Sequence, residues 1–559
     1  MPSWQELVAD KQQRQKAAIP REWLITPPPN SQLDVTDVPR TCGILTPQEL
    51  AITETEDVAV LLTKLASGEW TSVDVTRAFY KRAIIAQQVT NCLTEIFVER
   101  ALARAAECDR YLKENGKPIG HLHGLPVSLK DQVRIKGLET TMGYVSWIGD
   151  YAERDATLTT ILYEAGAVPF VRTNIPQTLM YGETHNSIFG RTVNPLNRNL
   201  TCGGSSGGEG ALIAMKGSPL GVGSDIGGSI RIPSAFCGVY GLRPSYNRIP
   251  YEGSANSIEG QDSVPSVLGP LSTSLSGVKA FTKAVVDLKP WAKDPLAIRK
   301  AWDEDAYQLK EHGDGKDLCF AILWSNGSTL PTPPIHRSLE ITKKALETQG
   351  IKVIDWPAHL FDYARLTLLL EYIWGAGSAE DYAAVVEKTG EPILTTMALD
   401  GVTIHNDWFP EIKPLSAFQL WQYQKERAVL RKQHLDLWES TRELSGTGRP
   451  VDAIICPVAP LAAAPHGKNV DFGYTGIWNG LDYPACTFPV SKVDLSVDLK
   501  QPRDTFLSKV DEFVHNIYEH EEWKNAPTAL QLVGRTLEEE AVIAMTEIVD
   551  RALKAERVK

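Results

Sequence analysis

Three short stretches of this chain combine the residue types that nucleophilic catalysis needs. Serine and glycine crowd together at residues 201–210, in TCGGSSGGEG, and again at 221–233, in GVGSDIGGSIRIP. Upstream of both, Lys130 ends an apolar run in GLPVSLKD. A serine attacks only when a base removes its proton, a lysine amine can be that base, and glycines let backbone N–H groups approach a reacting oxygen. The combination indicates acyl-transfer chemistry.

A linker, a phosphate-binding loop and a Ser-His-Asp site are all disfavoured for these stretches. A flexible linker has polar flanks, whereas the first stretch leads into the apolar residues 211–214. A phosphate-binding loop would show G-x-x-x-x-G-K-[ST] or G-x-G-x-x-G in a strand-to-helix context, and neither occurs. His121 and His123 flank the lysine stretch, but no G-x-S-x-G elbow accompanies them, which disfavours Ser-His-Asp chemistry.

Together the three stretches resemble the amidase-signature family, whose motif has a lysine, a serine-rich glycine loop and D-I-G-G-S in that order. The resemblance is specific and covers roughly residues 57–555 of the chain. The other matching segments are DA at 155–156, TN at 173–174, GRTVNP at 190–195, PSAFCG at 233–238, GLRP at 241–244, GPL at 269–271, DYPA at 482–485 and PTALQLVGR at 527–535.

The resemblance implies a role for each motif position. Ser229 matches the nucleophile, Lys130 matches the base, and Ser205 matches the bridging serine, which the family usually holds by a cis peptide bond. The implied oxyanion-hole donors are the backbone N–H groups of Ile226, Gly227, Gly228 and Ser229. The implied supporting residues are Ser206, Asp225 and Arg231, and the expected substrate-binding residues are Met180, Tyr181, Gly203 and Gly204.

Amide hydrolysis makes a definite demand on the lysine. A free lysine has a pKa of about 10.4 and is almost entirely protonated near neutral pH. The site must lower the pKa of Lys130 by about three, which costs about 4 kcal/mol of folding stability. Burial among Leu125, Val127 and Leu129 could supply this desolvation. Protonated Lys130 could then return the proton through Ser205 to the leaving nitrogen, and no metal or organic cofactor is needed.

The composition is that of a folded globular enzyme. Apolar residues make up 43% of the 559 residues and charged residues 23%, close to the averages for globular domains. Fifty-seven Lys and Arg against 69 Asp and Glu give a formal charge of −12, which disfavours nucleic acid as a partner. No transmembrane run and no apolar signal segment occur, and the eight cysteines form no C-x-x-C pair. We expect a cytoplasmic protein.

The elements that must position these residues alternate between helix and strand, which favours an α/β fold. The family implies a large mixed β-sheet covered by helices on both faces. We expect a helical arm at 1–55 and a catalytic domain at 56–559, with a less regular substrate-pocket region near 300–430. The predicted helices are 3–24, 56–65, 73–87 with Thr71 as its cap, and 155–164, and the predicted strands are 167–171, 318–323 and 451–456.

The less regular region is rich in aromatic residues. Such side chains could line a substrate pocket, although aromatic residues more often fill an ordinary core. The candidates are Phe361, Tyr363, Tyr372, Trp374, Trp408, Phe409, Trp421 and Tyr423.

The choice of substrate rests on a finer resemblance. The segments WQEL at 4–7, IPREW at 19–23 and AQQVTNC at 86–92 look most like fungal acetamidases, which implies small amides such as acetamide and release of ammonia. Longer or aromatic amides of the fatty acid amide type, carbamates and esters remain alternatives. A non-catalytic or ammonia-channelling subunit is disfavoured because the lysine and both serines are intact. The resemblance also allows a homodimer.

Overall fold

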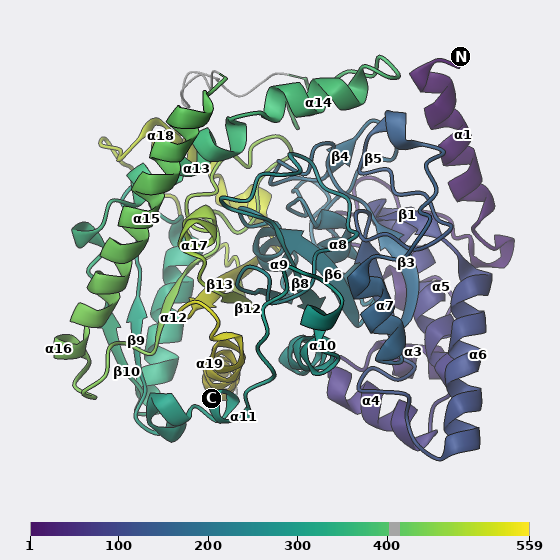
Figure 1. Cartoon of the computed structure of the whole chain (residues 1–559), viewed down its shortest axis with the longest axis horizontal. Helices are drawn as coiled ribbons and strands as arrows, with labels where there is room; N and C mark the ends of the chain where they lie inside the picture. Colours follow the sequence, from purple (N-terminus) through teal and green to yellow (C-terminus); the bar gives the residue numbers. More distant parts are fainter. Residues whose placement is uncertain (1, 402–413, 558–559) are drawn as a thin grey trace.

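The central feature of the fold is one mixed β-sheet (Figure 1). The computed structural model describes residues 2–401 and 414–557, and eleven strands of this part form the sheet. In sheet order they are β1 (Leu93–Ile96), β3 (Val168–Thr173), β2 (Pro126–Lys130), β6 (Leu220–Asp225), β8 (Val267–Ser272), β7 (Tyr240–Arg243), β12 (Ala485–Lys492), β13 (Pro527–Val533), β11 (Ala453–Pro457), β9 (Cys319–Ile322) and β10 (Lys352–Asp355). A separate pair joins β4 (His185–Asn186) and β5 (Gly190–Arg191).

Helices pack around this sheet, as predicted (Figure 1). In chain order they are α1 (Trp4–Ala17), α2 (Val38–Thr41), α3 (Pro47–Thr53), α4 (Val58–Ser67), α5 (Ser72–Thr90), α6 (Val98–Asn115), α7 (Thr157–Glu164), α8 (Gly207–Ala214), α9 (Arg231–Cys237), α10 (Leu275–Asp287), α11 (Glu304–Tyr307), α12 (Pro333–Thr348), α13 (Tyr363–Gly375), α14 (Ser378–Val386), α15 (Ala417–Ser440), α16 (Arg442–Ser445), α17 (Gly476–Leu481), α18 (Lys509–Ile517) and α19 (Glu539–Arg557). The region 300–430, expected to be less regular, contains β9, β10, α11, α12, α13, α14 and the first part of α15.

The strands that carry the motif are buried on both faces. β3, β2 and β6 run parallel to one another, while β8 pairs with β6 in the antiparallel direction. Every residue of these four strands is buried, as expected for sheet strands covered by helices on each side. Lys130 therefore ends its strand inside the protein, directly beside β6.

The predicted elements are present with shifted ends, and local chemistry explains the shifts. Thr71 caps helix α5, as predicted, because its hydroxyl accepts a hydrogen bond from the Asp74 N–H at 3.0 Å, and the helix begins at Ser72. Helix α1 ends at Ala17, since Pro20 disfavours a helical conformation for the residue before it. Helix α7 begins at Thr157, because the Asp155 carboxylate accepts the Lys136 N–H at 2.7 Å and lies outside the helix.

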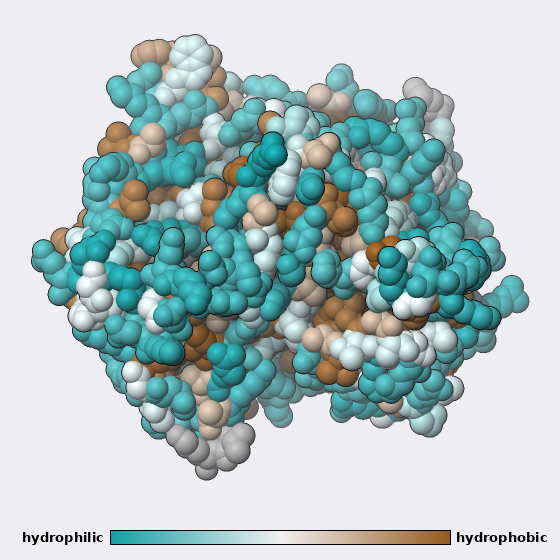
Figure 2. Space-filling model, turned by 60° about the horizontal axis from the view of Figure 1, so that its bottom comes forward, coloured by the Kyte–Doolittle hydropathy of each residue, from teal (hydrophilic) through white to brown (hydrophobic). Residues whose placement is uncertain are grey.

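The surface and the core are clearly separated. Figure 2 shows a face on which hydrophilic side chains predominate and hydrophobic ones lie mainly in recesses. Two large apolar clusters hold the molecule together, one on the side of β1 to β3 and one on the side of β11 to β13. Within the described ranges, no helix is both long enough and apolar enough to cross a membrane.

Candidate active site

The side chain of Lys130 lies at the centre of the candidate site. Its Nζ donates hydrogen bonds to Ser205 Oγ at 2.7 Å and to Ser224 Oγ at 2.8 Å, and the residue is completely buried. Burial lowers the pKa of the amine well below its ordinary value, although the nearby carboxyl groups of Asp225 and Glu209 act in the opposite direction. Burial thus favours the neutral form of the amine, which is the form that a general base requires.

The neighbouring Glu209 on α8 does not supply a countercharge to the lysine. Its carboxyl group accepts hydrogen bonds from Ser128 Oγ at 2.5 Å and Thr173 Oγ1 at 2.8 Å. Complete burial raises its pKa to about 8, against the effect of these hydroxyls and of Lys130. Near neutral pH the acid is therefore mainly protonated, and it does not form an ion pair with Lys130.

The three serines of the motif have different environments. The peptide bond between Gly204 and Ser205 is cis, as the resemblance implies. Ser206 is buried, and its hydroxyl bonds both the N–H and the carbonyl oxygen of Ser224 at 3.2 Å. Ser229 is 8% exposed and lines a pocket, and no group in the described part of the chain hydrogen-bonds its hydroxyl. Its oxygen is therefore open to a bound molecule.

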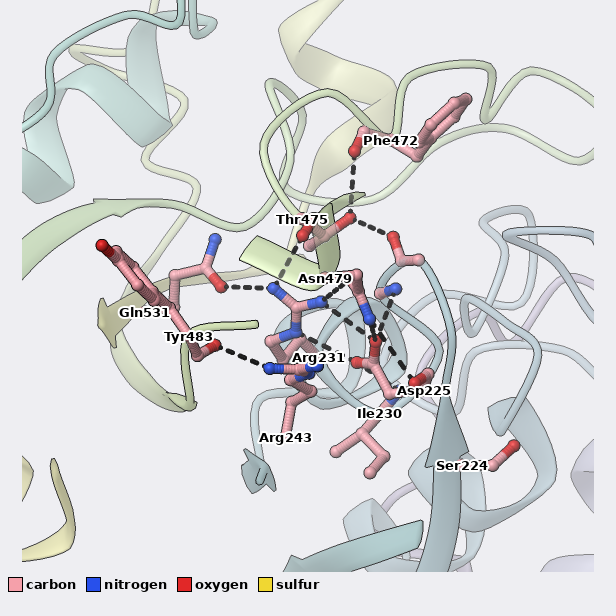
Figure 3. Close-up of polar contacts among 12 residues, drawn as sticks. Ser224, Asp225, Ile230, Arg231, Arg243, Phe472, Thr475, Asn479, Tyr483 and Gln531 are labelled. Atoms are coloured by element: carbon pink, nitrogen blue, oxygen red, sulfur yellow. Dashed lines mark hydrogen bonds and ion pairs between the residues drawn. The ribbon is translucent and has the colours of Figure 1, made fainter. Parts of the chain in front are cut away.

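A buried ion pair between Asp225 and Arg231 fixes the turn that carries Ser229 (Figure 3). Two N–H groups of Arg231 donate to the two carboxylate oxygens, each at 3.0 Å. The same carboxylate accepts the backbone N–H groups of Gly228 at 2.8 Å and Ile230 at 3.1 Å. Burial alone would raise the pKa of Asp225, but the charge and hydrogen bonds of Arg231 hold it at about 2. Asp225 therefore stays ionised.

Residues from the distant C-terminal part of the chain complete this network, as Figure 3 shows. The Arg231 guanidinium also donates to Thr475 O at 3.0 Å, to Asn479 Oδ1 at 2.6 Å and to Gln531 Oε1 at 3.1 Å. No role for Thr475, Asn479 or Ser224 was predicted from the sequence. Gln531 lies in the segment 527–535, which resembles the amidase-signature family, and this resemblance was the one indication in the sequence of its place in the site.

The four predicted oxyanion-hole donors are not equivalent. The Gly228 N–H is already donated to Asp225, whereas those of Ile226, Gly227 and Ser229 take part in no hydrogen bond with the described residues. Gly228 has a φ of +136°, and a Cβ there would lie 2.4 Å from Thr475 Oγ1, so the position requires glycine. The turn thus presents free N–H groups beside the Ser229 hydroxyl, a suitable arrangement for binding an oxyanion.

The pocket in front of Ser229 has a volume of about 520 Å³ and a mainly apolar wall. Of the four residues expected to bind substrate, Met180, Tyr181 and Gly204 line this pocket and Gly203 does not. The wall residues for which the sequence carried no prediction are Thr178, Leu179, Gly182, Ile232, Glu371, Gly375, Ser378, Tyr382, Ile393, Leu394, Asn469, Val470, Asp471 and Phe472.

One of the aromatic candidates lines this pocket. The ring of Trp374 lies so close to Gly227 that a Cβ there would be 3.1 Å from it. Phe361 and Tyr363 are buried in a core cluster instead. Tyr372 and Tyr423 stack on each other with ring centroids 4.8 Å apart, and Trp421 is 60% exposed. Trp408 and Phe409 lie outside the described residues.

Comparisons with known proteins find relatives that match nearly the whole chain. The profile of the family described as Amidase matches residues 74–543. Two curated fungal relatives, the acetamidases of Emericella nidulans and Aspergillus oryzae, are each 42% identical over 99% of this chain and over 98% and 99% of their own lengths. A solved structure of a fatty acid amide hydrolase superposes with a TM-score of 0.89 at 32% identity, covering 98% of this chain and 95% of that one.

The Asp225–Arg231 pair should contribute strongly to stability, which the substitution Arg231→Met tests. Removing one partner leaves a buried charge uncompensated, at a cost of about 3–5 kcal/mol. We expect the midpoint of urea unfolding to fall by a corresponding amount. The matched control is Arg40→Met. The Arg40 side chain is 50% exposed, and an ion pair at such a position contributes at most about 1 kcal/mol to the free energy of unfolding. Equal effects of the two substitutions would contradict this interpretation.

Proposed function

We propose that this chain, which belongs to the amidase-signature family of hydrolases acting on amide C–N bonds, hydrolyses short-chain carboxamides such as acetamide. The products are the carboxylic acid and ammonia. The observation that supports the mechanism most strongly is the buried Lys130 in hydrogen-bond contact with Ser205, with a pKa that burial lowers. The observation that supports the substrate is the similarity to two fungal acetamidases over nearly the whole chain.

In the proposed reaction, Ser229 is the nucleophile and forms an acyl-enzyme. Its oxygen bonds to the amide carbon while Lys130 accepts the serine proton through the Ser205 hydroxyl. The free N–H groups of Ile226, Gly227 and Ser229 stabilise the negative charge on the carbonyl oxygen; donors of this kind each lower a barrier by about 3–4 kcal/mol.

The same groups then work in reverse. Lys130 returns its proton through Ser205 to the nitrogen, the C–N bond breaks and ammonia leaves. Water next attacks the acyl-enzyme, and the relay accepts the proton of the water and gives it back to Ser229. A lysine that stays neutral at rest can perform both halves, because it is protonated only during the reaction.

The size of the pocket favours a second candidate function. A cavity of about 520 Å³ lies within the range of about 300–1,000 Å³ that binds drug-sized ligands. Acetamide, which is a methyl group on a carboxamide, fills only a small part of it. Hydrolysis of longer or aromatic amides with the same Lys130, Ser205 and Ser229 is therefore the alternative, and the resemblance in fold to a fatty acid amide hydrolase supports it.

A panel of substrates distinguishes the two candidates. We expect the purified chain to release ammonia from acetamide with a higher kcat/KM than from benzamide or oleamide. A clear preference for oleamide would overturn the acetamidase assignment and favour the second candidate. Absence of hydrolysis with every amide of the panel would contradict both.

Substitutions at the three proposed catalytic residues should differ in severity. Ser229→Ala should lower kcat for acetamide by about 10⁴-fold or more, and Lys130→Met should lower it by about 10²–10⁴-fold, the usual contribution of a general base. Ser205→Ala should have the smallest effect, because a water molecule can replace a relay hydroxyl. The assay is ammonia release by folded protein.

Two exposed residues provide matched controls for these substitutions. Ser67 and Lys16 are both exposed and remote from the motif in sequence, so Ser67→Ala and Lys16→Met should keep wild-type activity. Near-normal activity of Lys130→Met at neutral pH would show that the lysine is not the base.

A further inference from the structure

Two carboxyl groups line the pocket, and they differ in one respect. Asp471 accepts the backbone N–H of Gly473 at 2.7 Å, so it has a structural role in its loop. Glu371, on α13, receives neither a hydrogen bond nor an ion pair from any residue that the structure describes, although it forms part of the pocket wall. Its polar end is therefore free to bind a molecule that enters the pocket.

The position of Glu371 is fixed by its helix. Figure 1 shows α13 next to α14, and α13 also packs against α15 and α17. Near the end of α13, Trp374 lies against Gly227 of the turn that runs from Ile226 to Ser229, which we call the oxyanion turn. Two helical turns earlier, Thr367 faces Gly473, and a Cβ built on Gly473 would lie 3.9 Å from Thr367 Oγ1. Glu371 lies between these two positions, one turn before Trp374, which is a displacement of about 4.5 Å along the helix. Glu371 and Trp374 therefore belong to neighbouring turns of one helix in the pocket wall.

The surroundings of Glu371 are unfavourable for a carboxylate. The neighbouring lining residues include Trp374, Tyr382 and Phe472, which are mainly apolar. Burial raises the pKa of Glu371 to about 7, and no cationic side chain among the described residues opposes this effect. Glu371 is half-buried, and a carboxyl group that an apolar wall leaves without a partner is stabilised when a ligand donates a hydrogen bond to it. Such a group in a pocket is typical of a functional position.

The proposed chemistry decides which part of the substrate reaches this residue. The leaving group of a primary carboxamide is ammonia, so the remainder of the substrate in the pocket is the acyl chain. A donor at the far end of that chain would meet Glu371. An ammonium group suits the position best, because it supplies both hydrogen-bond donors and the countercharge that the wall lacks.

We propose that Glu371 is the specificity-determining residue of the pocket and pairs with the ammonium group of an ω-amino carboxamide whose amide lies at Ser229. This inference rests on the proposed amidase function and extends it to a substrate class. Glu371 acts by positioning the substrate chain and takes no part in the proton transfers.

The test compares two series of substrates of increasing length, the ω-amino carboxamides and the alkyl carboxamides with the same number of chain atoms. For the wild-type protein we expect one chain length at which kcat/KM for the amino compound exceeds that for the alkyl compound by about tenfold or more. Glu371→Gln should abolish this preference. Glu371→Leu should reverse it, because an apolar wall favours the alkyl chain.

Two further variants sharpen the test. Glu371→Asp keeps the charge on a side chain that is one methylene shorter, so the preferred amino compound should become longer. Glu380→Gln is the matched control, since Glu380 is exposed on the neighbouring α14, and its preference should equal that of the wild type.

The outcomes separate the two proposals. Turnover of both series with a preference that Glu371→Gln leaves unchanged, or with no preference at any length, would overturn the role of Glu371 alone. If neither series is hydrolysed, the proposed function fails and this inference fails with it.

Discussion

The burial of the Lys130 amine among hydroxyl groups is the constraint on which the site depends. In water this amine would be protonated, but inside the sheet it contacts the hydroxyls of Ser205 and Ser224, and the pKa is lowered accordingly. Two acids lie near enough to oppose this effect. Burial raises the pKa of Glu209, which favours its neutral form near neutral pH. Asp225 carries its negative charge in an ion pair with Arg231. The fold therefore provides two acids near the base without forming an ion pair with it.

The Asp225–Arg231 pair also connects the catalytic turn to the opposite half of the sheet. Arg231 reaches residues of α17 and β13, and Thr475 donates to the carbonyl of Gly227 at 2.6 Å. The segment of the pocket wall that ends at Phe472 lies three residues before Thr475 in the chain. Consequently the oxyanion turn, its supporting arginine and one wall of the pocket form a single hydrogen-bonded unit.

Much of the candidate site could be located from the sequence, because Lys130, Ser205 and Ser229 lie in short motifs whose spacing is informative; their catalytic roles stay a prediction. The remainder could not, for physical reasons. Thr475 and Asn479 lie about 250 residues beyond Arg231, as the sequence separations of 244 and 248 show, and only the folded chain brings them together. Glu371 could not be found because the periodicity of α13 does not reveal which of its faces borders a cavity.

The most direct test of the central claim is the pH dependence of the rate at which a fluorophosphonate labels Ser229, with the modified residue identified by mass spectrometry. Only neutral Lys130 can accept the serine proton, so the rate should rise with pH and level off well below pH 10.5, the ordinary pKa of lysine. Lys130→Met should label far more slowly and without this transition. A rate that continues to rise beyond that pH, or a Lys130→Met variant with the wild-type rate and profile, would contradict the account.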